Sequence, residues 1–518
     1  MTTLISDRPG PSRRPSRPVH RWELPQWSVP AAATVAVLAR VPFIGHAPGP
    51  DEAGFLLVGG QWDGPGSSLY GSYFVDRPPL LVTIFRAAAL LGGIPALRVI
   101  GCIAVVVVVV GCGRVATLVA GRYAGRWSSL AAAALCTSPL LGRYAVNGEL
   151  LAAPFVVLGM LAIVRGLRAD SRELAVAWMT SAGALAVCAV LVKQNFVDVA
   201  VFAGVLLVVS AARSELSARR SAGLAAAGLA GAAAATAVAA VWTVSHGTSL
   251  HSVYEAMYPF RVRAGQVIAT ESQGHAYGRL PGLVGAAIAS GLAVLVMLAA
   301  VDLARRRRRS TVEWALVAAV VLASASVALG GNFWHHYLVG LVVPVSVLSG
   351  VLAARAQPPR AAIGYVVGAA ALSWVAVLGL PQGSDGQTIG TAVAAAAEPH
   401  DTIINLYGHA DVVQTSGLTS PYAQLWSLPT KTLDPDLTEL DRVLTGPQAP
   451  TWVVTGRSVA TWGLRTADTV KIIGHDYRHV ATVCHRRIYL RDGISRPAPH
   501  PRTTCRGQLL GSTIEEKS

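Results

Sequence analysis

Long apolar runs recur along the first three quarters of the chain and are separated by short polar segments. Eleven of them reach or approach the length of about 20 residues that a helix needs to cross a bilayer. They cover residues 29–44, 97–120, 127–142, 150–164, 174–192, 196–211, 222–244, 282–304, 312–330, 337–354 and 361–380. The pattern therefore predicts a multispanning α-helical membrane protein with about eleven transmembrane helices.

The pattern changes after about residue 381, where Pro, Asp and Thr become regular and short β-rich runs alternate with helical stretches. The β-rich runs are Thr402 to Leu406, Thr451 to Thr455 and Arg487 to Leu490. Such alternation favours an α/β domain. We expect three parts: a disordered cytoplasmic tail (1–28), a transmembrane domain (29–380) and a C-terminal α/β domain (381–518).

Composition and charge fit this picture and exclude others. Of the 518 residues, 53% are hydrophobic and only 14% are charged, which excludes a disordered, collagen-like or nucleic-acid-binding chain. The net charge of +15 follows the loops: those on the side of the N-terminus carry 20 positive residues, Arg305 to Arg309 among them, and those on the other side carry far fewer. Because positive residues concentrate in cytoplasmic loops, we expect a cytoplasmic N-terminus and an exterior C-terminal domain. The alanine- and arginine-rich usage is typical of high-GC bacteria and indicates a bacterial plasma membrane.

The first exterior loop, about residues 45–96, combines two unusual charged elements. Asp51 and Glu52 follow the first span directly, and carboxylates beside a bilayer are costly unless they are solvated, paired or used. The alternative is a helix N-terminus, which acidic residues also favour. Asp76 and Arg77 precede Pro78 and Pro79, which fix the backbone, so that an anion can be received there. The alternative for this pair is a simple turn with a solvated arginine.

The two elements together match one kind of chemistry. An enzyme that uses a sugar carried on a polyprenyl phosphate needs a base for the acceptor hydroxyl and a cation for the departing phosphate, both near the membrane surface. Asp51 and Arg77 supply these two side-chain types on one loop.

The order of several elements resembles that of the type C (GT-C) glycosyltransferases. These elements are the first span, Pro50-Asp51-Glu52, a stretch with Tyr73, the Asp-Arg-Pro-Pro element, and the late Phe333 to Tyr337 followed by Pro344. The similarity is to the protein O-mannosyltransferase and aminoarabinose transferase branch, and it covers about residues 29–380. It implies a GT-C-like fold, Asp51 as the catalytic base with Glu52 as the neighbouring acid, and Arg77 on the donor phosphate. It also implies that Asp76 can help to hold a divalent cation, with no cofactor certain. Gly54 departs from the aminoarabinose type, which often has Arg shortly after the acidic pair, and this puts a specific lipid A role in doubt.

Further candidates lie at the exterior ends of other spans. Asn147 and Glu149 match a second acidic or amide position of the family, although Glu149 can also simply cap its helix. Lys193 is a second candidate for the donor phosphate, or a lysine that extends to the membrane surface. His335 and His336 can bind the donor or sit among interface aromatics.

The long exterior loop at about residues 246–281 is a candidate lid over the sugar and its lipid phosphate. It contains His251, Tyr258, Arg261 and Arg263, with the two arginines as phosphate-binding candidates. Each aromatic side chain there can equally belong to the interfacial belt of a membrane protein. One histidine with Asp76 is too small a set to assert a metal site.

The six cysteines fall into two groups. Cys102, Cys112, Cys136 and Cys188 lie in predicted spans, whereas Cys484 and Cys505 lie in the C-terminal domain. The last two can form a disulfide in an exterior domain or remain free thiols.

We therefore expect a glycosyltransferase that moves a hexosyl or pentosyl group from a polyprenyl-phosphate donor to a hydroxyl of an envelope glycan, lipid or protein, with inversion. Two rivals remain: a polytopic transporter or flippase of a lipid-linked sugar, and a non-catalytic GT-C-like scaffold of the cell envelope. A transporter is expected to carry charges or broken helices near the bilayer midplane. Here the acids and bases cluster at the ends of spans.

Overall fold

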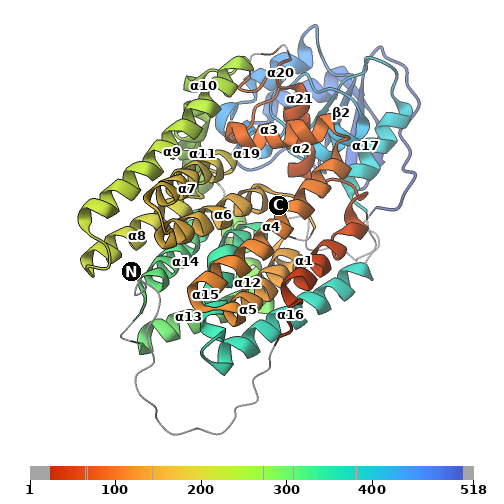
Figure 1. The fold of residues 1–518 in the computed structure, drawn as a ribbon. Coiled ribbons are helices and arrows are strands. Elements are labelled where there is room, and N and C mark those ends of the chain that lie inside the picture. Colours follow the sequence, from red (N-terminus) through yellow and green to blue (C-terminus); the bar gives the residue numbers. More distant parts are fainter. Residues whose placement is uncertain are drawn as a thin grey trace, which may run out of the picture.

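The computed structural model describes residues 24–64, 66, 68–142, 144–271, 273–306, 309–379 and 383–505. Most of the predicted N-terminal tail, residues 1–23, lies outside the described residues, and so does the predicted domain boundary at 380–382. The described chain is mostly helical, with one small sheet near its C-terminal end (Figure 1).

Seven helical segments in the described residues are long and apolar enough to cross a membrane. They are α4 (Ile94–Ala120), α6 (Gly148–Arg168), α7 (Arg172–Val192), α9 (Ala218–Ser245), α14 (Thr311–Leu329), the continuous pair of η3 (His335–Leu341) and α15 (Val342–Ala353), and α16 (Gln357–Leu378). An eighth span results if the bent pair α12 (Gln273–Ala289) and α13 (Leu292–Arg305) crosses as one. The multispanning helical fold class is thereby confirmed.

The other three predicted spans are also helices, but they are short or more polar. They are α1 (Ser28–Leu38), which continues into η1 (Val41–Phe43), α5 (Arg122–Thr137) and α8 (Asp198–Ala212). α8 has 15 residues and so measures about 22 Å at 1.5 Å per residue, less than the hydrocarbon thickness of a bilayer. All eleven predicted apolar runs therefore form helices, of which seven or eight have the length and composition of a full span.

The bend between α12 and α13 measures 73° and occurs at Ser290-Gly291. Gly291 has a φ of +81°, and a Cβ at this position would lie 2.6 Å from a methyl group of Val366 and 2.9 Å from the ring of Tyr365. Both the backbone conformation and the close approach of α16 require a glycine here.

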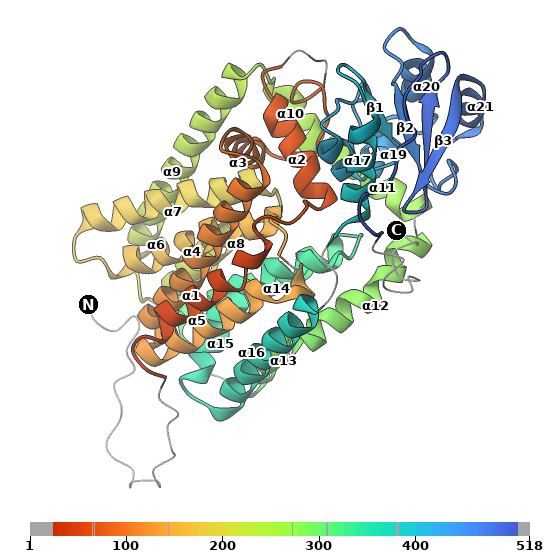
Figure 2. The same ribbon diagram turned by 90° about the vertical axis from the view of Figure 1, so that its right-hand side faces the viewer.

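Four helices of the two long loops gather at one end of the helical bundle. They are α2 (Pro50–Gln61), α3 (Pro79–Leu90), α10 (Leu250–Met257) and α11 (Pro259–Glu271). Figures 1 and 2 both place α2, α10 and α11 beside the C-terminal α/β part of the chain. Short 3₁₀ turns such as η2 (Pro139–Leu141) connect the longer helices below them.

The C-terminal part is built on a four-stranded sheet of order β1-β2-β4-β3. β1 (Ile403–Asn405) and β2 (Trp452–Thr455) are parallel, with Ile404 opposite Val453, while β4 (Arg486–Arg491) runs antiparallel to both β2 and β3 (Tyr477–Val483). The helices around it are α17 (Asp385–Ala396), α18 (Ala410–Ser416), α19 (Ser427–Leu433), α20 (Thr438–Thr445) and α21 (Ala467–Asp476). The three β-rich runs of the sequence coincide with β1, β2 and β4.

A disulfide joins Cys484, at the turn between β3 and β4, to Cys505 near the end of the described chain, with 5.3 Å between the Cα atoms. It ties the segment after β4 back to the sheet. The four cysteines in the helical bundle are free thiols.

Lys431 on α19 is an unusual residue of this part because it is a lysine with only 4% exposure. Its Nζ lies 3.1 Å from the centroid of the Trp462 ring, which stabilises the cation. Burial, followed by the charge of Arg279, nevertheless lowers the pKa of Lys431 to about 7. Its ammonium form is therefore destabilised in the folded protein relative to the unfolded chain.

The variant Lys431→Met should stabilise the protein, and the gain should shrink as the pH rises. Between pH 7 and the unfolded pKa of 10.5, the unfolded chain holds a proton that the folded chain lacks, so the stability of the wild type increases over this window. Below pH 7 the folded protein carries the full free-energy cost of the buried ammonium group. There we expect Lys431→Met to raise the free energy of unfolding by on the order of 2 kcal/mol. Thermal unfolding of detergent-purified protein at pH 6 and pH 9.5 measures it. Lys471→Met, at an exposed lysine paired with Asp468, is the control and should show no such gain; an equal gain at both pH values would contradict the prediction.

Candidate functional site

Asp51 lies in the first turn of α2, at the end of the bundle that faces the C-terminal part. The helix begins here because Pro50 fits its first position and the carboxylate of Glu52 accepts the backbone N–H of Gly49 at 3.1 Å. Asp51 is half-buried, and its Oδ1 accepts a 2.9 Å hydrogen bond from the indole N–H of Trp426. In the part of the chain that the structure describes, Oδ2 has no recorded donor.

Glu52 points away from this face and is buried, with 1% exposure. Its Oε2 forms a 2.7 Å ion pair with Nη2 of Arg98, and its Oε1 accepts the backbone N–H of Val146 at 2.7 Å. Together with Gly49, this carboxylate has three partners. The arrangement supports a role in holding α2 against α4 and the loop before α6, whereas the catalytic role predicted for Glu52 stays a prediction.

Asp76 and Arg77 lie in the segment that leads into α3, where Pro79 begins the helix. Oδ1 of Asp76 accepts a 2.7 Å bond from Nη1 of Arg77, and Oδ2 lies 2.8 Å from Nε of Arg261 on α11. One carboxylate thus lies between two guanidinium groups. Nη2 of Arg77 and both Nη atoms of Arg261 have no recorded acceptor among the described residues, so each arginine keeps donors for an additional anion.

The charges of this cluster act on one another. Burial alone would lower the pKa of Arg77, but Asp76 and then Asp51 raise it above the ordinary value. Burial lowers the pKa of Arg261, and the charge of Arg77 adds to this effect while Asp76 opposes it. The two arginines therefore share one region with Asp51, in which an anion would relieve their mutual repulsion.

A second group lies beside the first, where α6 begins and α7 ends. Glu149, in the first turn of α6, pairs with the ammonium group of Lys193, and Nε2 of His336 lies 3.8 Å from the same carboxylate oxygen. Nζ of Lys193 also lies 4.9 Å from the centroid of the Tyr337 ring. The charge of Glu149 contributes to the electrostatics of both Arg77 and Arg261. Six separate segments therefore contribute to one charged site, which consists of Asp51, Asp76, Arg77, Glu149, Lys193, Arg261 and His336.

Other predicted site residues have structural contacts or are exposed. The hydroxyl of Tyr73 accepts the backbone N–H of Ser420 at 2.9 Å, and Oδ1 of Asn147 caps α6 through the N–H of Leu150 at 2.9 Å. His335 lies near Gly282 of α12. His251 and Tyr258 are exposed at α10, and Arg263 is exposed on α11. For the last three, no contact with the charged cluster is recorded within the described ranges.

Sequence reasoning missed two residues of this region. Trp426 lies 375 positions from Asp51 in a segment without a motif, so no signal pointed to it. Arg98 lies inside a predicted span, where an ionisable residue indicates a paired or functional group, so its presence at the start of the apolar run was a usable signal.

The donor set around Asp76 does not fit a divalent cation. Both carboxylate oxygens already face arginines, and no three His, Cys, Asp or Glu side chains converge near Asp51 or Asp76 within the described residues. The described residues contain one such convergence, Asp385 with Cys484 and Cys505, but these two sulfur atoms form the disulfide and are not thiolates.

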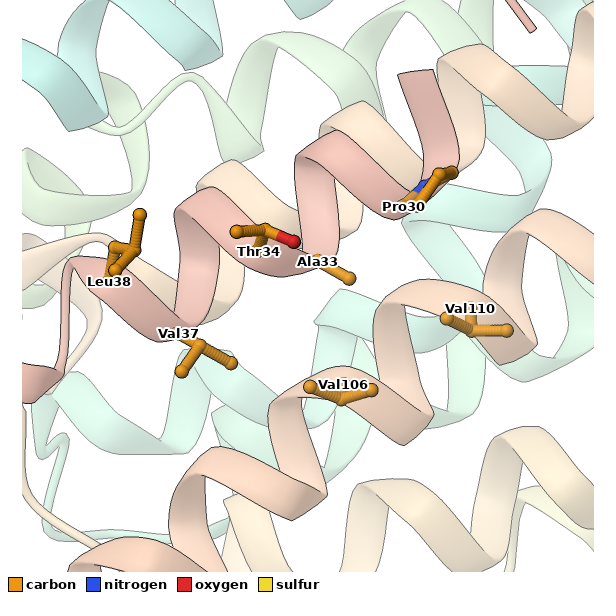
Figure 3. A pocket seen from close by; sticks show the side chains of 7 residues that line it. All are labelled: Pro30, Ala33, Thr34, Val37, Leu38, Val106 and Val110. Carbon is orange, nitrogen blue, oxygen red and sulfur yellow. The ribbon is translucent and has the colours of Figure 1, made fainter. Parts of the chain in front are cut away.

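An apolar groove of about 410 Å³ lies elsewhere, between α1 and α4 (Figure 3). Its lining consists of Pro30, Ala33, Thr34, Val37, Leu38, Val106 and Val110. None of the charged candidates lines it, and its composition is that of a surface that faces lipid. The groove therefore belongs to the membrane-embedded surface and not to the charged site.

Comparison with known proteins shows similarity of fold. No protein-family model and no curated protein matches the chain by sequence. The crystal structure of ArnT from Cupriavidus metallidurans in the apo state aligns with a TM-score of 0.60 at 14% identity, over 89% of this chain and 97% of that one. The same protein bound to undecaprenyl phosphate gives 0.57 at 14% identity, over the same shares. The oligosaccharyltransferase of Archaeoglobus fulgidus, in complex with Zn and sulfate, gives 0.53 at 13% identity, over 90% of this chain and 73% of that one. The GT-C-like fold that the sequence resemblance implied is thereby confirmed.

Proposed function

We propose that this multi-pass membrane protein is a glycosyltransferase that moves a sugar from a polyprenyl-phosphate donor to a hydroxyl group of an envelope acceptor. One observation carries the proposal. A carboxylate with one oxygen unoccupied by any described donor, Asp51, lies in the same electrostatic region as two arginines, Arg77 and Arg261, that retain donors for an anion. The similarity of fold to ArnT, which has been crystallised with undecaprenyl phosphate, supports a lipid-phosphate donor.

The proposed reaction is a single displacement. Asp51 accepts the proton of the acceptor hydroxyl as its oxygen forms a bond to the anomeric carbon. The bond from that carbon to the phosphate oxygen breaks, and both of its electrons leave with the polyprenyl phosphate. Arg77 and Arg261 neutralise the developing charge, with Lys193 able to approach from its pair with Glu149. Attack opposite to the leaving group inverts the anomeric centre.

We propose that the reaction takes place on the exterior side of the membrane and that it requires no metal ion. The bias of positive residues toward the loops on the N-terminal side supports a cytoplasmic N-terminus, so that the charged site and the C-terminal domain face the exterior. The arginines around Asp76 supply the charge stabilisation that a cation would otherwise provide. We therefore expect transfer to persist in EDTA.

Transfer of radiolabelled sugar from polyprenyl-phosphate donors, in membranes from a strain that lacks the native gene, tests the function. Label should enter the envelope acceptor only when the protein is supplied, and unlabelled undecaprenyl phosphate should compete. If no donor is consumed but labelled lipid changes leaflet in a protein-dependent way, the protein is a transporter. A strain whose envelope defect is rescued without any transfer indicates a scaffold.

Arg77→Gln should weaken the binding of undecaprenyl phosphate by roughly 10- to 100-fold, because it removes a charged donor and leaves Asp76 with only Arg261 as an ionic partner. Arg77→Lys should lose less, since it keeps the charge but not the forked geometry. Binding to the detergent-purified protein is the measurement. Arg263→Gln, at an exposed arginine two residues beyond Arg261, is the matched control and should bind as the wild type does. Equal losses in both variants would show that the effect is general attraction and not a site.

A further inference from the structure

Trp426 belongs to the C-terminal part of the chain, yet it lies on the face of α2 that carries Asp51. Residues 51, 54 and 55 share this face because helix positions three and four apart are neighbours. The indole N–H bonds to Asp51, and the Trp426 ring lies 5.3 Å from the ring of Phe55, between centroids. The indole therefore covers the helix from the carboxylate to the aromatic ring.

Gly54 is the position that admits this ring. A Cβ at Gly54 would lie 2.3 Å from Cζ2 and 2.7 Å from Cη2 of Trp426, distances that no side chain can occupy without displacing the indole. Gly54 has an ordinary helical backbone, so the requirement is for space and not for conformation. The glycine that departs from the related sequences thus has a physical reason: any larger residue would push Trp426 away from Asp51.

The segment before Trp426 is fixed to the loop that carries the phosphate-binding candidates. Ser420 donates its N–H to the hydroxyl of Tyr73, and Phe74 donates its N–H to the carbonyl of Ala423 at 3.0 Å. Asp76 and Arg77 follow Phe74 in the chain after the single residue Val75. The guanidinium carbon of Arg77 also lies 5.6 Å from the centroid of the Phe55 ring, and Phe55 is the same side chain that contacts Trp426. One short segment of the C-terminal part therefore contacts both α2, which carries Asp51, and the loop that leads to Asp76 and Arg77.

We infer that Trp426 is a positioning residue for Asp51, and that docking of the C-terminal part on α2 completes the catalytic site. The inference rests on the proposed function. By holding Oδ1, the indole N–H fixes the carboxylate rotamer and leaves Oδ2 as the oxygen that accepts the proton of the acceptor. A base oriented by a third group is a common arrangement in enzymes that activate a hydroxyl. The C-terminal part then serves in the chemistry itself.

Two variants separate positioning from support of the fold. Trp426→Phe keeps most of the ring but removes the N–H, and should lower kcat about 10-fold while leaving the affinity for undecaprenyl phosphate and the melting temperature unchanged. Trp242→Phe is the matched control, because its indole N–H also bonds to a side chain, the hydroxyl of Thr83 at 2.9 Å, at a distant and exposed position. A Trp426→Phe enzyme with the kcat of the wild type would overturn the inference.

Gly54→Ala tests the contact without relying on activity. It should lower the melting temperature in the wild-type background but not when combined with Trp426→Leu, because the smaller side chain removes the clash. Gly60→Ala is the matched control on the same helix, since its Cβ would meet only the Cβ of Ala89 at 3.7 Å. Absence of this coupling would overturn the docked geometry. If the coupling is present but the wild type transfers no sugar, the proposed function fails, and the catalytic role of Trp426 fails with it.

Discussion

Asp51→Asn should lower the turnover number about 10³-fold while the affinity for the donor lipid stays within about twofold of the wild type. Asparagine has the size of aspartate, and its carbonyl oxygen can still accept the indole N–H of Trp426. The helix and its contact with the C-terminal part should therefore persist. What the variant loses is the ability to take a proton from the acceptor hydroxyl.

The measurement is single-turnover transfer from a radiolabelled polyprenyl-phosphate sugar, together with binding of undecaprenyl phosphate to the purified variant. Asp63→Asn is the matched control: it lies just beyond the other end of α2 and forms a half-exposed pair with Arg86. It should transfer sugar at the rate of the wild type. An Asp51→Asn protein that is as active as the control would show that Asp51 is not the base, and unchanged leaflet exchange in both variants would favour a transporter.

The helices of the membrane part could be predicted from the sequence because each apolar run has the length and composition of a buried or lipid-facing helix. All eleven predicted runs are helical, yet a continuous apolar run conceals where a helix bends. The run at 282–304 is interrupted at Gly291, where the left-handed backbone and the contact with α16 bend the chain by 73°. Such a bend depends on a neighbour 75 residues away, Val366, and the hydrophobic pattern around Gly291 does not predict that contact.

The residue types of the candidate site could be predicted from the sequence, but most of the contacts between them could not. Asp51, Asp76 and Arg77 share one loop, so their types and spacing were sufficient to bring them together. Arg261 joins Asp76 through a tertiary contact, and Trp426 reaches Asp51 from the C-terminal part. Hydropathy and charge describe the environment of each segment but not the pairing between segments, so neither property identifies these partners.

Glu52 shows how two adjacent acids can differ in their roles. Neighbouring positions on a helix point in directions about 100° apart, so Asp51 faces Trp426 while Glu52 enters the protein and pairs with Arg98. We expect Glu52→Gln to destabilise the protein by about 3–5 kcal/mol, because it leaves the buried guanidinium of Arg98 without its counter-charge. The melting temperature of the purified protein should fall by roughly 3–5 °C.

The control for this prediction is Glu173→Gln, because Glu173 also lies in the first turn of a helix, α7, but is exposed. It should change the melting temperature by less than about 1 °C, as an exposed helix-terminal charge contributes little. In the double variant Glu52→Gln with Arg98→Met, much of the stability should return, since the uncompensated charge is gone. The folded fraction of Glu52→Gln should transfer sugar with nearly the kcat of the wild type. A Glu52→Gln protein that is fully stable but inactive would instead place Glu52 in the chemistry, as the family resemblance implies.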